Sequence, residues 1–260
     1  MSAESNRLSR VSRVTIALIL GIALSLGALV AGSTGDAGAE TALKAKKRSK
    51  ILGNVGKFPD ARCPAECSGL AIVTGFQASV DGVPNSYRVP FTGHLTKWKI
   101  GLGKPTKSQR TFFESRFGSP PKAGISVLRP VKVQGKQRYK LMRRSPVIGL
   151  NRYLGQISTI SLTKPIPVRK GDFVALTIPT WAPALAADFE MNDGKIVRDS
   201  KGNALPNPES TWRASRQRST CLEAPSMENS APQTEPGSRF EYGCRFDGQL
   251  LYRAKVVTRR

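Results

Sequence analysis

The residues best suited to binding chemistry are six cations in one short stretch of sequence, VKVQGKQRYKLMRRSP, at positions 131–146. They are Lys132, Lys136, Arg138, Lys140, Arg143 and Arg144. Lysine offers a point charge, and arginine offers a planar fork of N–H donors that matches the oxygens of phosphate or carboxylate. The stretch therefore predicts an anion-binding surface.

Two aromatic residues are candidates for stacking on the sugar rings of a ligand. Tyr139 lies among the six cations, and Trp181 stands at the end of a predicted strand. An exposed tyrosine or tryptophan presents a large apolar face together with a polar group. Packing in the core is the alternative for Trp181 and equally for Trp98 and Trp212. We expect Tyr139 and Trp181 to contribute to a glycan site if their rings are exposed.

The charge of the whole chain points in the same direction. The 260 residues carry a net charge of +23, and Glu114 is the only acid in residues 82–171. The same segment has 19 lysines and arginines, whereas residues 172–260 have 12 bases and 11 acids. A concentrated positive field attracts polyanions and speeds their encounter at low salt. The alternative is a solvated surface that keeps the protein soluble.

Residues suited to catalysis are few. His94 is the only histidine, and it lies at the start of a predicted strand, where a hydrogen-bonded structural role is the simpler interpretation. The nucleophile motif GxSxG and the zinc motif HExxH are both absent from the sequence. We therefore expect a protein that is not an enzyme and needs no cofactor.

One acidic cluster, DFEMNDGKIVRD at positions 188–199, resembles a calcium loop only in part. Asp188, Glu190 and Asn192 alternate as oxygen ligands do, but the required glycine comes one position too late. Asp172, Asp188 and Glu190 could alternatively form the carboxylate pair of a glycosidase, a mechanism that depends on their separation. A hairpin with solvated acids is the preferred interpretation, and a secreted carbohydrate-active or wall-modifying enzyme is the alternative function.

The chain has four cysteines: Cys63, Cys67, Cys221 and Cys244. An even number in an exported chain predicts two disulfides, and three pairings are possible. We favour Cys63–Cys67 with Cys221–Cys244, because these local loops need no global geometry. A zinc site is the alternative, but the spacing and the single histidine argue against it.

The N-terminus has the features of an export signal. Three arginines, at positions 7, 10 and 13, precede an apolar run over residues 14–32, and Ala37-Gly38-Ala39 is a suitable cleavage site. The run is long for a signal and reaches the length of a membrane span. Residues 1–39 are therefore predicted to be a cleaved signal or a retained anchor helix. Either outcome places the remainder outside the cytoplasm.

The remainder divides into a basic linker and one folded domain. Residues 40–60 contain TALKAKKRSKILGNVGKF, which has six lysines and arginines and no acid, and predict an extended arm. Residues 61–260 show short β-rich runs at about ten-residue spacing, which is typical of an all-β sandwich or barrel. The expected strands lie near residues 70–80, 94–101, 124–133, 139–144, 153–163, 173–180 and 248–257, with a long loop over residues 101–121.

Two of these strands have informative patterns. FVALTIPT, at residues 173–180, is apolar on both faces and is expected at the centre of a sheet. In HLTKWKIG, at residues 94–101, strict alternation would place His94, Trp98 and Ile100 on one face and Leu95 with the lysines on the other.

The segments VPFTGHLTKWKIG, GISVLRP and IPVRKGDFVALTIPTWAP together resemble a family of exported, uncharacterised β-sandwich proteins of high-GC Gram-positive bacteria. The resemblance spans residues 70–183. It implies a single antiparallel β-sandwich of jelly-roll type and an extracellular or envelope location, and it implies no activity.

The sequence thus predicts an exported, non-catalytic module that binds an anionic envelope polymer or glycan through its basic surface. A membrane tether through residues 14–32 follows if the signal is retained. Nucleic acid is the third candidate partner, because the charge suits it, but export argues against it. The sequence does not define the ligand or the oligomeric state.

Overall fold

The computed structural model describes residues 47–56, 58, 69–186, 191–192, 195–196, 200–202, 209–221 and 231–258. All of these belong to the compact unit formed by residues 45–260. The predicted signal or anchor segment lies outside the described residues, as do Cys63 and Cys67. No helix within the described part is long and apolar enough to cross a membrane.

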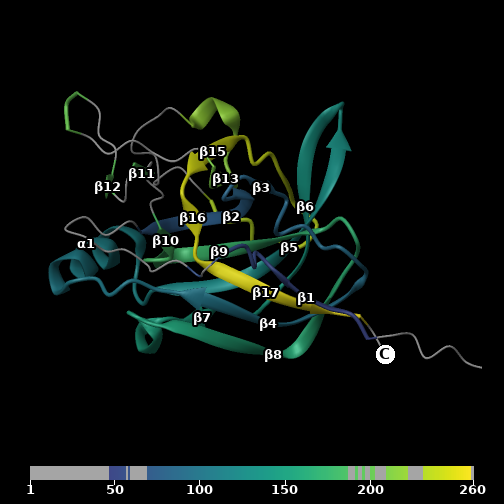
Figure 1. Ribbon diagram of the computed structural model, residues 1–260, viewed down its shortest axis with the longest axis horizontal. Helices are drawn as coiled ribbons and strands as arrows, with labels where there is room; N and C mark the ends of the chain where they lie inside the picture. The colour runs from purple at the N-terminus through teal and green to yellow at the C-terminus, as the bar shows by residue number, and fades with distance from the viewer. Residues whose placement is uncertain are drawn as a thin grey trace, which may run out of the picture. The chain divides into compact units, whose positions relative to one another are not determined.

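The fold is mostly β and antiparallel, which confirms the all-β prediction (Figure 1). A four-stranded sheet, here the small sheet, has the order β1-β17-β4-β8. Its strands are Ser49–Leu52, Tyr252–Val257, Gly93–Gly101 and Ile157–Val168, respectively. The first of these, β1, lies within the stretch expected to be a linker and pairs along its length with β17.

A second, large sheet has the order β14-β6-β5-β9-β2-β13-β15, with β3 beside β2 and β7 beside β5. Its strands are Arg239–Phe240, Lys136–Arg144, Lys122–Val133, Phe173–Ala182, Leu70–Val80, Thr211–Ala214, Cys244–Asp247, Val83–Pro84 and Ile148–Gly149. The apolar strand β9 occupies a central position, as its sequence predicts.

Short elements complete the described fold. Two-stranded pairs form between β10 and β16 and between β11 and β12, the second at the predicted hairpin. These strands are Leu185–Ala186, Gln249–Leu250, Met191–Asn192 and Lys195–Ile196. Single turns of 3₁₀ helix cover Asn151–Tyr153 and Arg218–Thr220.

The main core lies between the two sheets. Buried side chains of β4 and β17, such as Trp98 and Tyr252, belong to one cluster with Val127 of β5 and Val174 of β9. Alternate residues of β9 face the other way, so Phe173 joins a second cluster on the opposite face of the large sheet. This two-sided burial explains why β9 is apolar throughout.

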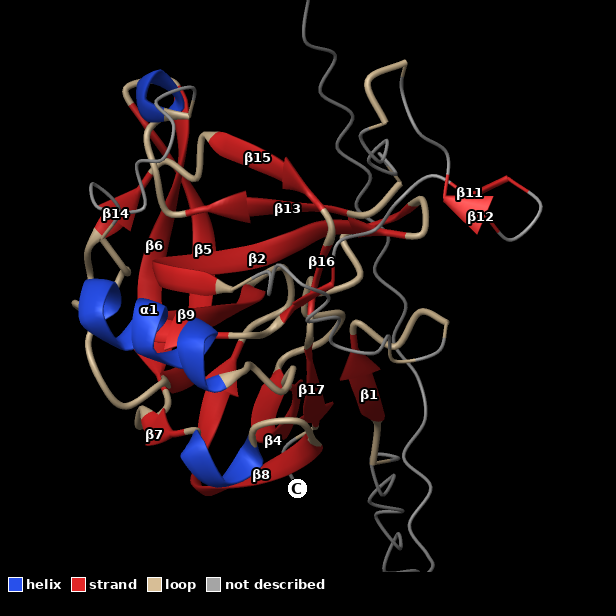
Figure 2. Cartoon of the chain, turned by 90° about the vertical axis from the view of Figure 1, so that its left-hand side faces the viewer, coloured by secondary structure: helices blue, strands red, loops and turns tan. Residues whose placement is uncertain are grey.

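The α-helix α1, Lys107–Phe117, occupies part of the expected loop over residues 101–121 and therefore corrects that prediction. Thr106 and Gln109 form a capping box, in which each side chain bonds the other residue's backbone N–H. Only Phe113 of the helix is buried, so no apolar stripe reveals it in the sequence. Figure 2 shows α1 lying across the large sheet at β9.

The strand β4 departs from strict alternation. Its pairing with β8 shifts register between Leu95 and Lys97, and as a result Leu95 is buried beside Trp98 and Ile100. His94 falls on the other side, half-exposed, with the lysines. The expectation that His94 shares a face with Trp98 is therefore wrong, because Thr96 is an extra residue in the pairing with β17, where Lys97 lies opposite Lys255 and Leu95 opposite Val256.

Candidate anion-binding surfaces

The six predicted cations lie on one β-hairpin, formed by β5 and β6, which rises from the large sheet in Figure 1. Gln134 and Gly135 make its tight turn with φ angles of 50° and 75°, the geometry that suits the twist of a two-residue hairpin. Lys132 is on β5, and the other five are on β6. Lys132, Lys136, Arg143 and Arg144 are exposed, whereas Arg138 and Lys140 are half-buried.

The pairing of the strands brings Lys140 beside two cations that the sequence did not suggest. Arg129 of β5 lies opposite Lys140, and Arg239 of β14 lies opposite it on the other side. We call Arg129, Lys140 and Arg239 the cation row. Like charges directly opposite each other in a sheet are destabilising. A bound anion would relieve the repulsion within this row wherever no acid of the protein already offsets it.

One end of the row is tied to a buried acid. Arg129 donates from Nε to Oδ1 of Asp172 at 2.7 Å and from Nη2 to Oδ2 at 2.9 Å. The side chain of Asp172 is 2% exposed, and that of Arg129 is 26% exposed. The hydrogen bond to Asp172 raises the pKa of the Arg129 guanidinium. Asp172, considered as a catalytic carboxylate, is instead a fixed partner of Arg129.

Arg138 is also neutralised within the protein. Its Nη1 donates to Oε2 of Glu241 at 2.5 Å, with both side chains about 70% removed from solvent. The bond to Arg138 lowers the pKa of the Glu241 carboxyl. Arg138 thus belongs to an ion pair within the protein. The charges that remain for an external partner are those of Lys132, Lys136, Lys140, Arg143 and Arg144.

A second cationic surface covers the outer face of the small sheet. Lys97 of β4 lies opposite Lys255 of β17, and Lys99 lies opposite Arg253. These four residues line a shallow hollow of about 190 Å³. The four strands of this sheet contain no aspartate or glutamate. We call the four residues the cation face.

Arg253 differs from the three lysines because it holds the chain that follows β1. Its guanidinium donates to Oδ1 of Asn54 at 2.8 Å and to the carbonyl of Gly56 at 3.1 Å, and it lies 4.9 Å from the ring of Phe58. Burial lowers the pKa of Arg253. The three lysines are therefore the residues of the cation face suited to an external anion.

The two aromatic candidates differ in burial. Trp181 is 0% exposed and stacks on Phe113 of α1, with ring centroids 5.0 Å apart and planes 14° apart. Tyr139 is half-buried against Phe76 and Tyr242, and desolvation raises its pKa. Burial of Trp181 corrects its assignment to glycan stacking, whereas the assignment of Tyr139 stays a prediction.

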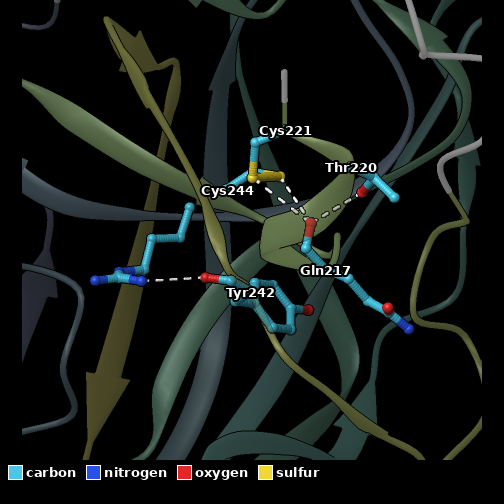
Figure 3. The surroundings of a disulfide bond; sticks show 6 residues. Gln217, Thr220, Cys221, Tyr242 and Cys244 are labelled. Carbon is cyan, nitrogen blue, oxygen red and sulfur yellow. Dashed lines mark hydrogen bonds between the residues drawn. A yellow bond between two sulfur atoms is a disulfide. The ribbon is translucent and has the colours of Figure 1, made fainter. Parts of the chain in front are cut away.

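The disulfide Cys221–Cys244 is present, as expected (Figure 3). The carbonyl oxygen of Gln217 lies 3.5 Å from the sulfur of Cys221 and 3.3 Å from that of Cys244. It accepts a hydrogen bond from the hydroxyl of Thr220 at 2.9 Å. The bridge thereby fixes the start of β15 against the 3₁₀ turn at 218–220.

The remaining candidates for metal or catalytic chemistry lie partly outside the described residues. Among the described residues, no three histidine, cysteine, aspartate or glutamate side chains gather as metal ligands would. Asp188 and Glu190 lie outside the described residues, as does the side chain of Asn192.

Comparison with protein-family models, with curated proteins and with solved structures finds no match to this chain. The resemblance to exported β-sandwich proteins stays a prediction. The function is therefore argued from the geometry of the charged surfaces, because a fold alone does not fix a function.

Proposed function

We propose that this chain is an exported, non-catalytic module that binds an anionic polymer of the cell envelope through the cation row and the cation face. The observation that carries the proposal is the placement of like charges opposite one another in register, in both sheets. Such a pair costs stability where no acid of the protein offsets it, as for Lys140 with Arg239 and Lys97 with Lys255, whereas Asp172 offsets the charge of Arg129. A bound polyanion converts that cost into attraction.

The spacing of the cations suits a polymer better than a single small ion. Neighbouring strands lie about 4.8 Å apart, so the cation row spans roughly 10 Å across β5, β6 and β14. The exposed Lys132, Lys136 and Arg144 extend the charge along the same hairpin. A chain with repeated phosphate or carboxylate groups would contact several of these residues at once and displace their counterions.

Export supports an envelope location for that polymer. The apolar run over residues 14–32 follows three arginines and precedes a suitable cleavage site. A retained run would tether the module to the membrane, and a cleaved run would release it. The basic stretch before β1 would lie on the same outer side in both cases.

We also propose that the fold is a jelly-roll β-sandwich with added strands. Taking β1, β2, β4, β5, β6, β8, β9 and β17 as successive strands A to H gives the sheets A-H-C-F and B-G-D-E. Two four-stranded sheets in that order characterise the jelly roll. The strands β13 and β15 extend the second sheet beyond B.

Sedimentation with isolated, lipid-free cell walls tests the function. The full chain, kept soluble with an uncharged detergent, is mixed with walls at salt concentrations from about 50 mM to about 500 mM, a range over which counterion-linked binding falls steeply. We expect strong binding at low salt that disappears at high salt. Binding independent of salt, or its absence at every salt concentration, would contradict the proposal.

Variants assign the binding to the two surfaces. Lys140→Ser with Arg239→Ser removes two charges of the row, and Lys97→Ser with Lys255→Ser removes two of the face. The matched control is Lys104→Ser with Lys107→Ser, two exposed lysines at the start of α1. Both test pairs should weaken wall binding more than the control does. If DNA of equal charge concentration removes the protein from the walls completely, nucleic acid becomes the better assignment.

A further inference from the structure

A second cavity, which shares Arg129 with the cation row, lies between the β8 edge of the small sheet and strands β5 and β6 of the large sheet. Its volume is about 300 Å³, and it is lined by residues of β4, β8, β5, β6 and the turn after β8. Five lining residues carry polar side chains: Thr92, His94, Arg129, Arg143 and Arg169. Three arginines and the only histidine of the chain therefore border one small space, and Nη1 of Arg143 donates to the carbonyl of Met142 at 2.8 Å.

Asp172 positions the guanidinium of Arg129 for this cavity. Two of the five N–H donors of Arg129 are taken by the Asp172 carboxylate, which leaves three for another acceptor. Because the carboxylate is buried, it fixes the plane of the guanidinium without occupying the cavity. An arginine held in this way loses little conformational entropy when it binds an anion.

The same acid also fixes the turn that presents Arg169. Oδ2 of Asp172 accepts the backbone N–H of Arg169 at 2.9 Å, and the backbone N–H of Lys170 donates to the hydroxyl oxygen of Thr92 at 3.3 Å. Gly171 adopts a φ of 93°, which an L side chain rarely adopts. The hydroxyl proton of Thr92 therefore remains for a ligand that lies in the cavity.

We infer that this cavity binds a single phosphoryl group. The polar lining residues come from β4, β5, β6 and the turn after β8, so a tetrahedral group with several acceptor oxygens can meet donors from more than one side, whereas one arginine fork already satisfies a planar carboxylate. In Arg129, the Asp172 carboxylate already occupies the edge of the guanidinium formed by Nε and Nη2. The inference rests on the proposed function to the extent that the phosphoryl group belongs to the envelope polymer, as a phosphodiester within it. Free inorganic phosphate is the other source of the same chemistry.

The only histidine gives a direct readout. In the full chain, the ring resonances of His94 are followed by NMR at constant chloride during titration with inorganic phosphate, with glycerophosphoglycerol as the phosphodiester, and with acetate. We expect a saturable shift with at least one of the two phosphates and none with acetate at the same concentration. Saturation by the diester assigns the polymer as the source, and saturation by inorganic phosphate alone assigns the free ion.

Two substitutions test the assignment to this cavity. Arg169→Gln and Arg143→Gln should each raise the Kd for phosphate about tenfold, since a hydrogen bond to a charged group contributes about 1.5 kcal/mol or more. Arg152→Gln, which removes a charge stacked on Tyr153, should leave the Kd unchanged. Absence of a saturable shift with both phosphates, an equal shift with acetate, or equal effects of all three substitutions would overturn the inference.

The phosphate titration and the wall-binding experiment can fail independently of each other. If phosphate does not bind but wall sedimentation remains salt-dependent, the cavity assignment fails and the proposed function stands. If phosphate binds while walls do not, the cavity assignment stands and the polymer is overturned as its source.

Discussion

Lys97 and Lys255 lie directly opposite each other on neighbouring strands β4 and β17, and Lys99 and Arg253 form the next such pair. No acid is present in the four strands of this sheet to offset them. Opposed like charges contribute about 0.2–1 kcal/mol of destabilisation per pair in exposed positions. The arrangement therefore lowers stability unless an anion offsets it, as the proposed function requires.

Lys97→Glu should separate the effect of the cation face on binding from its effect on stability. It replaces a repulsive pair with an attractive one, so the free energy of unfolding should rise by about 0.5 kcal/mol at low salt and less at high salt. Urea unfolding at two salt concentrations measures the change, with Lys97→Gln, which removes the repulsion without adding an attraction, as the comparison. Wall binding should weaken in the same variant. A more stable protein that binds walls as well as before would mean that the cation face has no binding role.

Asp172→Asn should destabilise the protein through Arg129. The substitution leaves a half-buried guanidinium without its charged partner, and breaking such a pair costs about 3 kcal/mol. Arg129→Met should cost a similar amount because it strands the buried carboxylate. The double variant should cost less than the sum of the two. Additive costs in urea unfolding would show that the two groups do not act as a pair.

Removing the disulfide should destabilise the protein without abolishing the fold. Cys221 and Cys244 are 23 positions apart, and closing a loop of that length stabilises the folded state by about 3 kcal/mol in the chain-entropy model. The segment within the loop contains Arg239 of the cation row, so wall binding should weaken as well. Cys221→Ser with Cys244→Ser, compared in urea unfolding, measures the stability. A loss well below 1 kcal/mol would show that other contacts hold this segment.

The sequence predicted where the strands lie better than which strands pair with one another. β9 was identified as central because it is apolar on both faces. The helix α1 was missed because its capping box, Thr106 and Gln109, precedes a segment with a single buried residue, Phe113. The capping box was the available signal. The bulge at Thr96 was missed because alternation of apolar residues cannot reveal an extra residue in one strand.

The sequence predicted the candidate sites only in part, because it does not show which strands pair. Lys140 was identified from local charge density, but Arg129 and Arg239 became its neighbours only through pairing of β6 with β5 and β14. Lys97 and Lys255 are 158 positions apart, so only the register brings them together. Burial of Trp181 depends on α1, for which the capping box is the signal in the sequence. Non-local pairing, rather than residue type, was the missing information.

Three buried tyrosines should make the fold sensitive to alkali. Burial raises the pKa of Tyr87, Tyr242 and Tyr252 above the usual value near 10. The hydroxyl of Tyr87 donates to the carbonyl of Tyr252, and that of Tyr252 donates to the carbonyl of Val174 at 2.7 Å. Ionisation of either phenol would remove a donor from a dry site.

The sign of the effect follows from the raised pKa values. Below about pH 10 the phenols are neutral in both the folded and unfolded states, so stability is independent of their titration. Above it the unfolded chain loses protons that the folded chain retains, and the free energy of unfolding falls by up to about 1.4 kcal/mol per pH unit for each phenol. Tyrosinate absorbance should therefore show these groups ionising only as the protein unfolds, whereas the chain in urea should titrate in one step. Ionisation of all five tyrosines near pH 10 with the fold intact would show that the three phenols are accessible to water.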